Sequence, residues 1–295
     1  MCKAVKLIAG ACLAVLTAGG CHSKQIVFVP AEEAARAYAE AGYRLVWADE
    51  FNTDGQPNPD NWTYEHGFVR NEELQWYQPE NAFCEDGWLI IEGRRETVDN
   101  PLYEPDSRYW KRRRKQAAYT SACLTSSGLQ EWRYGRFEIR AKIETQPGLW
   151  PAIWTLGSAR GWPACGEIDI MEYYDHSILA NACWSEGGRE AVWDGRKIPL
   201  SELGGDDWGG RAHVWRMDWD AETIRIFVDG RLLNTIEIDK TVHPRLGISP
   251  FREPHYILLN LAIGGTRGGD PSQTPFPAQY KIDYVRVYQK KQAAD

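Results

Sequence analysis

Short runs in which apolar and polar residues alternate constrain the fold of this chain more than any other feature. Apolar residues occupy every second position over 137–143 and again over 224–228. Successive side chains of a β-strand point to opposite faces, so a period of two is typical of a half-buried strand. The second run ends at Asp229-Gly230, a turn pair that predicts a hairpin with the run 231–233.

Further strands are predicted over nine runs of similar length. These are residues 44–47, 87–93, 118–126, 150–156, 166–173, 178–184, 212–219, 256–262 and 279–288. No long helical period competes with them, and there is no internal repeat and no linker rich in proline or serine. Many short strands in one stretch are typical of an antiparallel β-sandwich. We therefore expect one all-β domain over residues 43–290.

The N-terminal residues have the pattern of an export signal. Lys3 and Lys6 precede an apolar run over 7–16, which is too short to span a membrane and is followed by small residues before Cys21. This arrangement resembles a bacterial lipoprotein signal, with residues 1–20 removed and the lipid carried by Cys21. An ordinary cleaved signal peptide is the alternative. Either reading predicts export, and the first predicts an anchor at the cell surface or facing the periplasm.

Residues 21–42 are expected to tether the anchor to the domain. An Ala-rich stretch over 30–42, acidic near its start and closed by Gly42, predicts a short helix. The membrane would then be contacted only through the lipid.

Four cysteines remain within the predicted domain. They are Cys84, Cys123, Cys165 and Cys183. An exported protein can hold disulfides, and four cysteines allow three pairings. The spacing contains no CxxC and no Cys/His cluster with metal-ligand spacing. Buried thiols and one or two disulfides are equally compatible with this pattern.

Composition narrows the class of partner. The chain has 34 Lys and Arg against 41 Asp and Glu, a formal net charge of −7, which argues against nucleic acid. It also has 14 Trp and 14 Tyr but only 8 Phe. Trp and Tyr combine an apolar face with a polar edge, so their excess indicates surfaces that are both stacked and wet. A neutral substrate fits this composition, and we expect a monomer.

Three carboxylates lie within six residues of the predicted strand 166–173. Glu167 and Asp169 share one face, whereas strict alternation would place Glu172 on the other. One extra residue near Ile170-Met171, a β-bulge, would bring all three to the same face. Like charges held together and partly desolvated repel one another, so the cluster indicates catalysis rather than folding.

Paired carboxyl groups are the machinery of glycoside cleavage. One carboxylate attacks the sugar as a nucleophile, and a protonated carboxylic acid donates its proton to the leaving oxygen. The middle residue, Asp169, would hydrogen-bond Glu167, orient it and help to hold a proton between the steps. A metal site built from these acids is a weaker reading, because no histidine lies at ligand spacing.

Several motifs, taken in order, resemble glycoside hydrolase family 16 in its laminarinase-like branch with a bulged acid motif. They lie at residues 49–52, 71–77, 134–138, 148–154, 162–172 and 283–288. The resemblance covers about residues 43–288 and implies a β-jelly-roll with an open substrate cleft. It also implies that Glu167 is the nucleophile, Asp169 the assisting residue and Glu172 the acid/base.

A sugar-binding groove needs aromatic faces and fixed polar groups. Trp150 and Trp154 are four residues apart on a predicted strand and therefore share a face, and Trp184 ends the strand that follows the acids. The resemblance implies that Asn71 contacts substrate. Asn260 is a lone polar residue in an apolar strand and needs a partner, either in the cleft or in the structure. Packing within the sandwich is the alternative role of the three tryptophans.

No cofactor is expected to be required. The resemblance implies a possible structural calcium ion, with Glu50 and Asp283 as weak ligand candidates and an ordinary ion pair as the alternative. Alternation places Asp283 on the face of Val285 and Val287 and predicts that it is buried and paired. His213 and His255 flank strands and are expected to be structural rather than catalytic.

One segment departs from the acidic background. Residues 111–115 are all Lys or Arg, in what the pattern predicts to be an exposed insertion. A solvated loop explains it, and recognition of an anionic glycan, sulfated or sialylated, is the alternative.

The resulting prediction is an endo-acting, retaining O-glycosyl hydrolase. The resemblance favours internal β-1,3 or mixed β-1,3/1,4 linkages of a β-glucan as substrate. The alternative is an endo-β-galactosidase acting on mucin-type O-glycans or related galactose-containing host glycans. A non-catalytic glycan-binding protein is a minor alternative, since all three acids are present.

Overall fold

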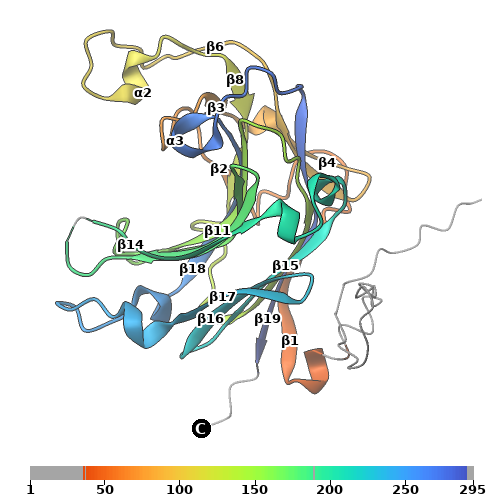
Figure 1. Cartoon of the computed structure of the whole chain (residues 1–295), viewed down its shortest axis with the longest axis vertical. Helices are drawn as coiled ribbons and strands as arrows, with labels where there is room; N and C mark the ends of the chain where they lie inside the picture. Colours follow the sequence, from red (N-terminus) through yellow and green to blue (C-terminus); the bar gives the residue numbers. More distant parts are fainter. Residues whose placement is uncertain (1–35, 37, 189, 291–295) are drawn as a thin grey trace, which may run out of the picture.

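Two antiparallel β-sheets stacked face to face form the body of the protein in this computed structural model (Figure 1). The structure describes residues 36, 38–188 and 190–290. The eight-stranded sheet has the order β17-β16-β15-β10-β19-β5-β4, with β1 also paired to β19. The seven-stranded sheet has the order β14-β13-β12-β11-β18-β9-β2. The expected all-β sandwich is confirmed.

The strands of the eight-stranded sheet are β1 (Tyr43–Asp49), β4 (Ala82–Glu85), β5 (Trp88–Gly93), β10 (Gly135–Lys142), β15 (His213–Trp219), β16 (Thr223–Val228), β17 (Arg231–Glu237) and β19 (Ala278–Lys290). Those of the seven-stranded sheet are β2 (Thr63–Tyr64), β9 (Cys123–Thr125), β11 (Leu149–Gly157), β12 (Glu167–Tyr174), β13 (Ser177–Trp184), β14 (Val192–Pro199) and β18 (His255–Ile263).

Small elements decorate the sandwich. Two pairs of short strands lie outside the main sheets: β3 (Gln75–Tyr77) with β8 (Tyr119–Ser121), and β6 (Val98–Asp99) with β7 (Gln116–Ala117). The short helices are α2 (Trp110–Arg113) and α3 (Gly265–Gly268). The 3-10 turns are η1 (Pro79–Asn81), η2 (Leu200–Glu202), η3 (Asp206–Gly210), η4 (Ile238–Thr241) and η5 (Pro250–Arg252).

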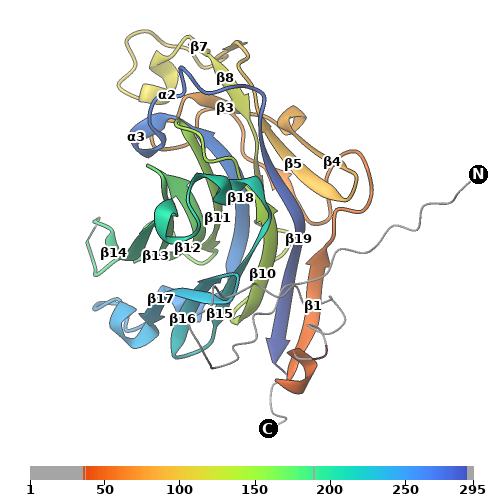
Figure 2. The ribbon, with the colours of Figure 1, turned by 45° about the vertical axis from the view of Figure 1, so that its right-hand side comes forward.

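Alternation decides which side chains fill the space between the sheets. On β10 the apolar residues Phe137, Ile139 and Ala141 are buried in the core. The polar residues between them face the outer side of the eight-stranded sheet, which is visible with β19 and β1 in Figure 2. The predicted hairpin is also confirmed, because Asp229 and Gly230 both have positive φ and join β16 to β17.

The strand β14 was not predicted. Its sequence includes Gly195 and two consecutive charged residues, Arg196 and Lys197, and most of its side chains are exposed. It lies at the edge of the seven-stranded sheet, where neither face needs a continuous apolar pattern. Its pairing with β13 therefore depends on the sheet rather than on its own sequence.

The end of the predicted N-terminal helix is present. Arg36 and residues 38–40 are helical, and the Tyr38 hydroxyl donates to Glu138 on the outer side of the eight-stranded sheet. Residues 1–20 and Cys21 lie outside the described residues. Within the part of the chain that is described, no helix is both long and apolar enough to cross a membrane.

The four cysteines of the domain are free and buried. Of the two readings open from the sequence, buried thiols are the one found. Burial raises the pKa of the Cys84 thiol to about 12 and that of Cys165 to about 11, so these thiols stay protonated and unreactive at neutral pH.

Candidate active site

The predicted β-bulge is present in β12. Against β11, the residues Met171 and Asp169 oppose the consecutive residues Ile153 and Trp154, which leaves Ile170 as the extra residue. The register with β13 shifts over the same stretch. Ile170 and Met171 both point into the core, so Glu172 returns to the face that carries Glu167 and Asp169.

Each carboxylate of this cluster is held by specific donors. The indole of Trp162 donates to Glu167 Oε2 at 2.6 Å, and the indole of Trp150 donates to Glu172 Oε1 at 2.8 Å. Asn181 on β13 bridges Asp169 and Glu172, donating to Asp169 Oδ2 at 3.1 Å and to Glu172 Oε2 at 3.0 Å. These donors fix the orientation of all three carboxyl groups before any substrate arrives.

Burial raises the pKa of every carboxyl in the cluster, and repulsion adds to the shift at Glu167 and Asp169. Burial, followed by the negative charge of Glu172, raises the pKa of Glu167 to about 7. Burial and the charges of both glutamates raise the pKa of Asp169 well above its usual range, and burial raises that of Glu172. Indole donors and, for Glu167, the Arg70 guanidinium oppose these shifts. The cluster therefore retains at least one proton near neutral pH.

This arrangement can separate a nucleophile from an acid. Asp169 is within hydrogen-bonding reach of both glutamates and is itself almost inaccessible to solvent. A proton held on Asp169 can bond either neighbour, which allows one glutamate to be ionised while the other is protonated. Two carboxyls in opposite protonation states on one face match the acid and carboxylate pair that glycoside cleavage requires.

An open groove above the three acids contains most of the predicted substrate contacts. Its lining includes Arg70, Asn71, Glu73, Trp150, Ala152, Trp154, Glu167, Asp169, Glu172, Asn260 and Ala262. The structure thus brings four predicted substrate-binding residues, Asn71, Trp150, Trp154 and Asn260, to the same place as the catalytic acids.

Asn260 is engaged within the protein. Its Oδ1 accepts a hydrogen bond of 2.7 Å from the Trp154 indole, and its Nδ2 donates to the Tyr77 hydroxyl at 3.0 Å. These bonds satisfy the buried amide and fix the Trp154 ring, so Asn260 shapes the floor of the groove.

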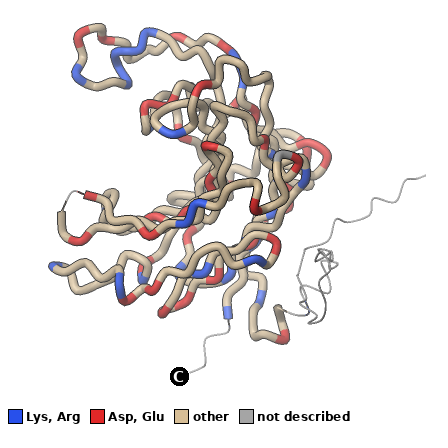
Figure 3. Tube along the Cα trace, viewed as in Figure 1, with Lys and Arg blue, Asp and Glu red and all other residues tan. Residues whose placement is uncertain are grey.

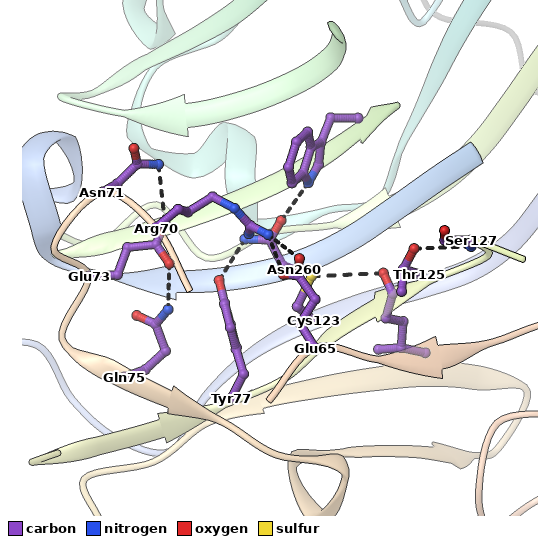
Figure 4. A network of polar contacts seen from close by, with 12 residues as sticks. Glu65, Arg70, Asn71, Glu73, Gln75, Tyr77, Cys123, Thr125, Ser127 and Asn260 are labelled. Carbon is purple, nitrogen blue, oxygen red and sulfur yellow. Dashed lines mark hydrogen bonds and ion pairs between the residues drawn. The ribbon is translucent and has the colours of Figure 1, made fainter. Parts of the chain in front are cut away.

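A polar network supports this floor (Figure 4). Arg70 makes an ion pair with Glu65, and its guanidinium lies 4.9 Å from the centre of the Trp154 ring. Glu73, which is buried, accepts hydrogen bonds from Asn71 at 3.2 Å and Gln75 at 2.7 Å. The network places a fixed cation beside the groove and holds Asn71 at its edge.

The prediction for Trp184 is wrong. Trp184 lies in the core between the two sheets and its ring is 6.4 Å from that of Phe251. On β13 the groove side is taken by Asn181, so the alternation of the strand sends Trp184 to the opposite face. This tryptophan packs the sandwich and does not face the groove.

Both candidate calcium ligands are engaged in ion pairs. Both Glu50 oxygens accept hydrogen bonds from Arg286, at 2.7 and 2.8 Å, and Asp283 pairs with Arg140 at 2.5 Å. Among the described residues there is no group of three or more His, Cys, Asp or Glu side chains arranged to hold a metal ion. The ion-pair alternative is the arrangement found.

The face predicted for Asp283 also needs correction. The register between β10 and β19 shifts so that Arg140 pairs with Tyr284 while Ala141 pairs with Ile282. Ile282 and Val285 both point into the core, whereas Asp283 lies between them on the outer side and is only partly buried. The irregularity breaks the alternation on which the prediction depended.

The two histidines are structural, as predicted. His213 Nδ1 lies 2.6 Å from Asp229, and its ring stacks on Trp208. His255 is buried beside Thr155, and burial lowers its pKa to about 4, so it stays neutral.

Three groove residues escaped sequence reasoning. Trp162 directly contacts Glu167, Asn181 bridges two acids, and Arg70 adds a positive charge. Trp162 precedes the acid motif by five residues and could have been inferred from that position. Nothing local marks Asn181 or Arg70, because their partners come from other elements.

A further aromatic side chain lies in line with Glu167. Trp193 on β14 is 49% exposed and pairs with Cys183, which in turn pairs with Glu167. A large exposed aromatic in the same row of the sheet as an active-site acid offers a face on which a sugar ring can stack.

A β-sandwich with this bulged triad of acids in an open groove defines a retaining glycosidase. The family model of glycosyl hydrolases family 16 matches residues 88–286. The chain is 35% identical over 268 residues to a β-glucanase of Rhodothermus marinus, covering 83% of this chain and 85% of that protein. The chain therefore belongs to glycosyl hydrolases family 16 and is an O-glycosyl hydrolase.

Solved structures agree with this assignment. The laminarinase catalytic domain of Thermotoga maritima is 34% identical, with a TM-score of 0.69 over 85% of this chain and 99% of that one. A second structure comes from work on endo-acting O-glycanases that members of the human gut microbiota express to initiate mucin breakdown. It is 34% identical, with a TM-score of 0.78 over 85% of this chain and 92% of that one.

Proposed function

We propose that the protein is an endo-acting, retaining β-glycosidase that hydrolyses internal β-1,3 or mixed β-1,3/1,4 linkages of a β-glucan. The observation that carries this proposal is the bulge in β12, which places Glu167, Asp169 and Glu172 on one face of an open groove. An open groove admits the interior of a long chain. Similarity to a β-glucanase and to a laminarinase supports the choice of glucan.

The reaction proceeds in two displacements. Glu167, ionised, attacks the anomeric carbon and forms a glycosyl ester while Glu172 gives its proton to the departing glycosidic oxygen. Glu172, now a carboxylate, takes a proton from water, and the resulting oxygen nucleophile displaces Glu167 from the sugar. Asp169 hydrogen-bonds both glutamates and can stabilise each charge state in turn. Two inversions at the same carbon give net retention.

Azide rescue of two variants tests the roles. Glu167→Ala should lose hydrolysis and, with azide and an activated β-glycoside, should form the α-glycosyl azide, because azide replaces the nucleophile. Glu172→Ala should form the β-glycosyl azide, because azide attacks the glycosyl-enzyme. NMR of the product anomer separates the two. The same anomer from both variants, or unchanged hydrolysis by either, contradicts the assignment.

A second substrate class is favoured by one observation. The structure associated with mucin O-glycanases has a TM-score of 0.78 at the same 34% identity as the laminarinase. The second candidate is therefore an endo-β-galactosidase acting on mucin-type O-glycans. Parallel digestion of laminarin, lichenan, keratan-type chains and mucin, with sizing of the products, decides between them. Cleavage of mucin glycans alone would replace the glucan proposal.

We also propose that the enzyme is an exported, monomeric lipoprotein attached through Cys21. The support is the basic and apolar pattern of residues 1–20 followed by small residues and a cysteine. Labelling of cells with a radioactive fatty acid should mark the wild type and not Cys21→Ser. Equal labelling of the variant would contradict lipid attachment at Cys21. Sedimentation of the soluble domain tests whether the protein is a monomer.

A further inference from the structure

The segment between β6 and β7, residues 100–115, forms a projecting arm at one end of the molecule (Figure 1). We call it the basic arm. It contains six Lys or Arg against two Asp or Glu, in a chain of formal net charge −7. Figure 3 shows blue segments gathered along this loop. The arm is therefore a local reversal of the charge of the protein.

The arm has a built base. The buried side chain of Asn100 donates to the backbone carbonyls of Lys111 at 2.7 Å and Arg114 at 2.8 Å. Its own backbone N–H donates to the Lys115 carbonyl at 2.9 Å. These bonds close the two ends of the loop on one another, so the basic residues are presented from a defined position.

Arg114 attaches the arm to the edge of the groove. Its guanidinium donates to the backbone carbonyl of Glu72 at 2.7 Å and to that of Glu73. It also lies 4.8 Å from the centre of the Trp110 ring, which itself lies 5.8 Å from the Phe68 ring. Glu73 lines the groove, so Arg114 of the arm directly contacts a residue of the substrate site.

A second cation, Arg267, belongs to α3, which contacts the same loop as Arg114. The backbone N–H of Thr266 in α3 donates to the Asn71 carbonyl at 2.9 Å, and the next residue, Arg267, is exposed. Arg267 is close enough to Glu172 to lower the pKa of that acid. Positive charge therefore borders the groove near the acid/base as well as on the arm.

Only some of the basic side chains of the arm are engaged by other groups of the protein. Arg112 pairs with Glu104, and Arg114 is committed to the carbonyls described above. Lys111, Arg113 and Lys115 are exposed and make no ion pair with any described residue. Like charges held close on one loop repel one another, and this cost is offset when an anion binds between them.

We propose that the basic arm is an accessory binding site for anionic groups, sulfate esters or carboxylates, carried by the glycan outside the sugar that is cleaved. This inference rests on the proposed function and adds to it the charge class of the substrate chain. Lys111, Arg113 and Lys115 supply the charge, and Arg114 fixes their distance from the groove. The enzyme then prefers a decorated chain over the same chain without its charges.

Binding to an inactive enzyme tests the proposal independently of cleavage. The Glu167→Gln protein is titrated with laminarin, with laminarin bearing sulfate esters and with laminarin oxidised to carboxylates at C6. The charged chains should bind more tightly, with an advantage that falls as salt is raised. Adding Lys111→Gln, Arg113→Gln and Lys115→Gln should reduce that advantage about tenfold. The two charged probes separate sulfate from carboxylate recognition.

A matched control makes the same change of charge on the eight-stranded sheet, away from the basic arm. Arg44→Gln, Arg225→Gln and Lys290→Gln remove three exposed cations from β1, β16 and β19 and should leave the advantage unchanged. Circular dichroism of both triple variants checks their folding.

The outcomes separate this inference from the proposed function. Equal binding of charged and uncharged chains, or equal loss in the control, overturns the inference. Vesicles of anionic lipid are a further probe. If the triple variant of the arm loses binding to these vesicles but not to the charged glycans, the inference is also overturned. If the wild type cleaves none of the glucans while the preference still depends on the arm, the inference stands and the glucan proposal falls.

Discussion

The two sheets of this protein treat acidic side chains in opposite ways. On the eight-stranded sheet two buried acids have partners of another kind: Asp218 is bound by Arg136 at 2.6 and 2.9 Å, and Glu138 accepts hydrogen bonds from Tyr38 and Tyr284. On the seven-stranded sheet three acids face one another, and their nearest donors are indole and amide groups.

The difference separates acids that stabilise the fold from acids that take part in the reaction. A buried carboxylate paired with a guanidinium stays ionised and serves structure. A carboxyl that is buried and also faces other carboxylates holds its proton to higher pH, and burial followed by the charge of Glu172 raises the pKa of Glu167 to about 7. The large upward shifts, at Glu167 and Asp169, therefore lie on the sheet that carries the groove, and the reaction uses them.

The largest effect is expected from exchanging one acid on each sheet. Glu172→Gln should lower kcat by about 10²- to 10⁴-fold, because the leaving oxygen no longer receives a proton. Glu138→Gln changes a fully buried acid on the eight-stranded sheet and should keep kcat near that of the wild type. Steady-state rates on a polysaccharide measure both. Similar losses of rate would erase the contrast between the sheets.

The ion pairs of the eight-stranded sheet should carry stability instead. Arg136→Met leaves the buried Asp218 with only the longer contact to Arg216 and should lower the free energy of unfolding by about 3 kcal/mol. The exposed pair Lys240–Glu237 is the control, and Lys240→Met should leave the free energy of unfolding almost unchanged. Urea unfolding gives both values. Equal losses would mean that burial of the pair contributes nothing.

The acids of the groove should destabilise the fold at high pH. Because the pKa of Glu167 rises from 4.5 to about 7 on folding, the folded state binds more protons than the unfolded state between these values. Stability present below about pH 4.5 is therefore lost as pH rises to about 7. Glu167→Gln should gain about 1–3 kcal/mol over the wild type at about pH 8 and almost nothing at about pH 4. A pH-independent difference would contradict this linkage.

The smallest effect is expected at the indole that holds Glu167. The Trp162 hydrogen bond lowers the pKa of Glu167, so Trp162→Phe should raise it. The acidic limb of the kcat/KM profile, expected near pH 7, should move to higher pH by less than about one unit. Trp208→Phe, which changes a core tryptophan away from the groove, is the control and should leave the limb in place.

Local pattern was sufficient for most of the long strands, though not for β14, and for the acid triad. The positions of Glu167 and Glu172 can share a face only if one residue is inserted between them, so the bulge follows from spacing alone. The same reasoning failed at Asp283, because the register shift between β10 and β19 is not marked by any charged motif in the sequence. It failed at Trp184, because a strand can present either face to the core.

The sequence by itself determined the all-β class, the order of the strands along the chain and the identity of the three acids, because these depend on periods of a few residues. Only the tertiary structure decided which residues hold those acids. Asn181, Trp150 and Arg70 come from separate elements and meet β12 through sheet pairing and loop packing. Side-chain donors and charges act over a few ångströms in space, so the proton states that the reaction needs are set by neighbours that no local pattern identifies.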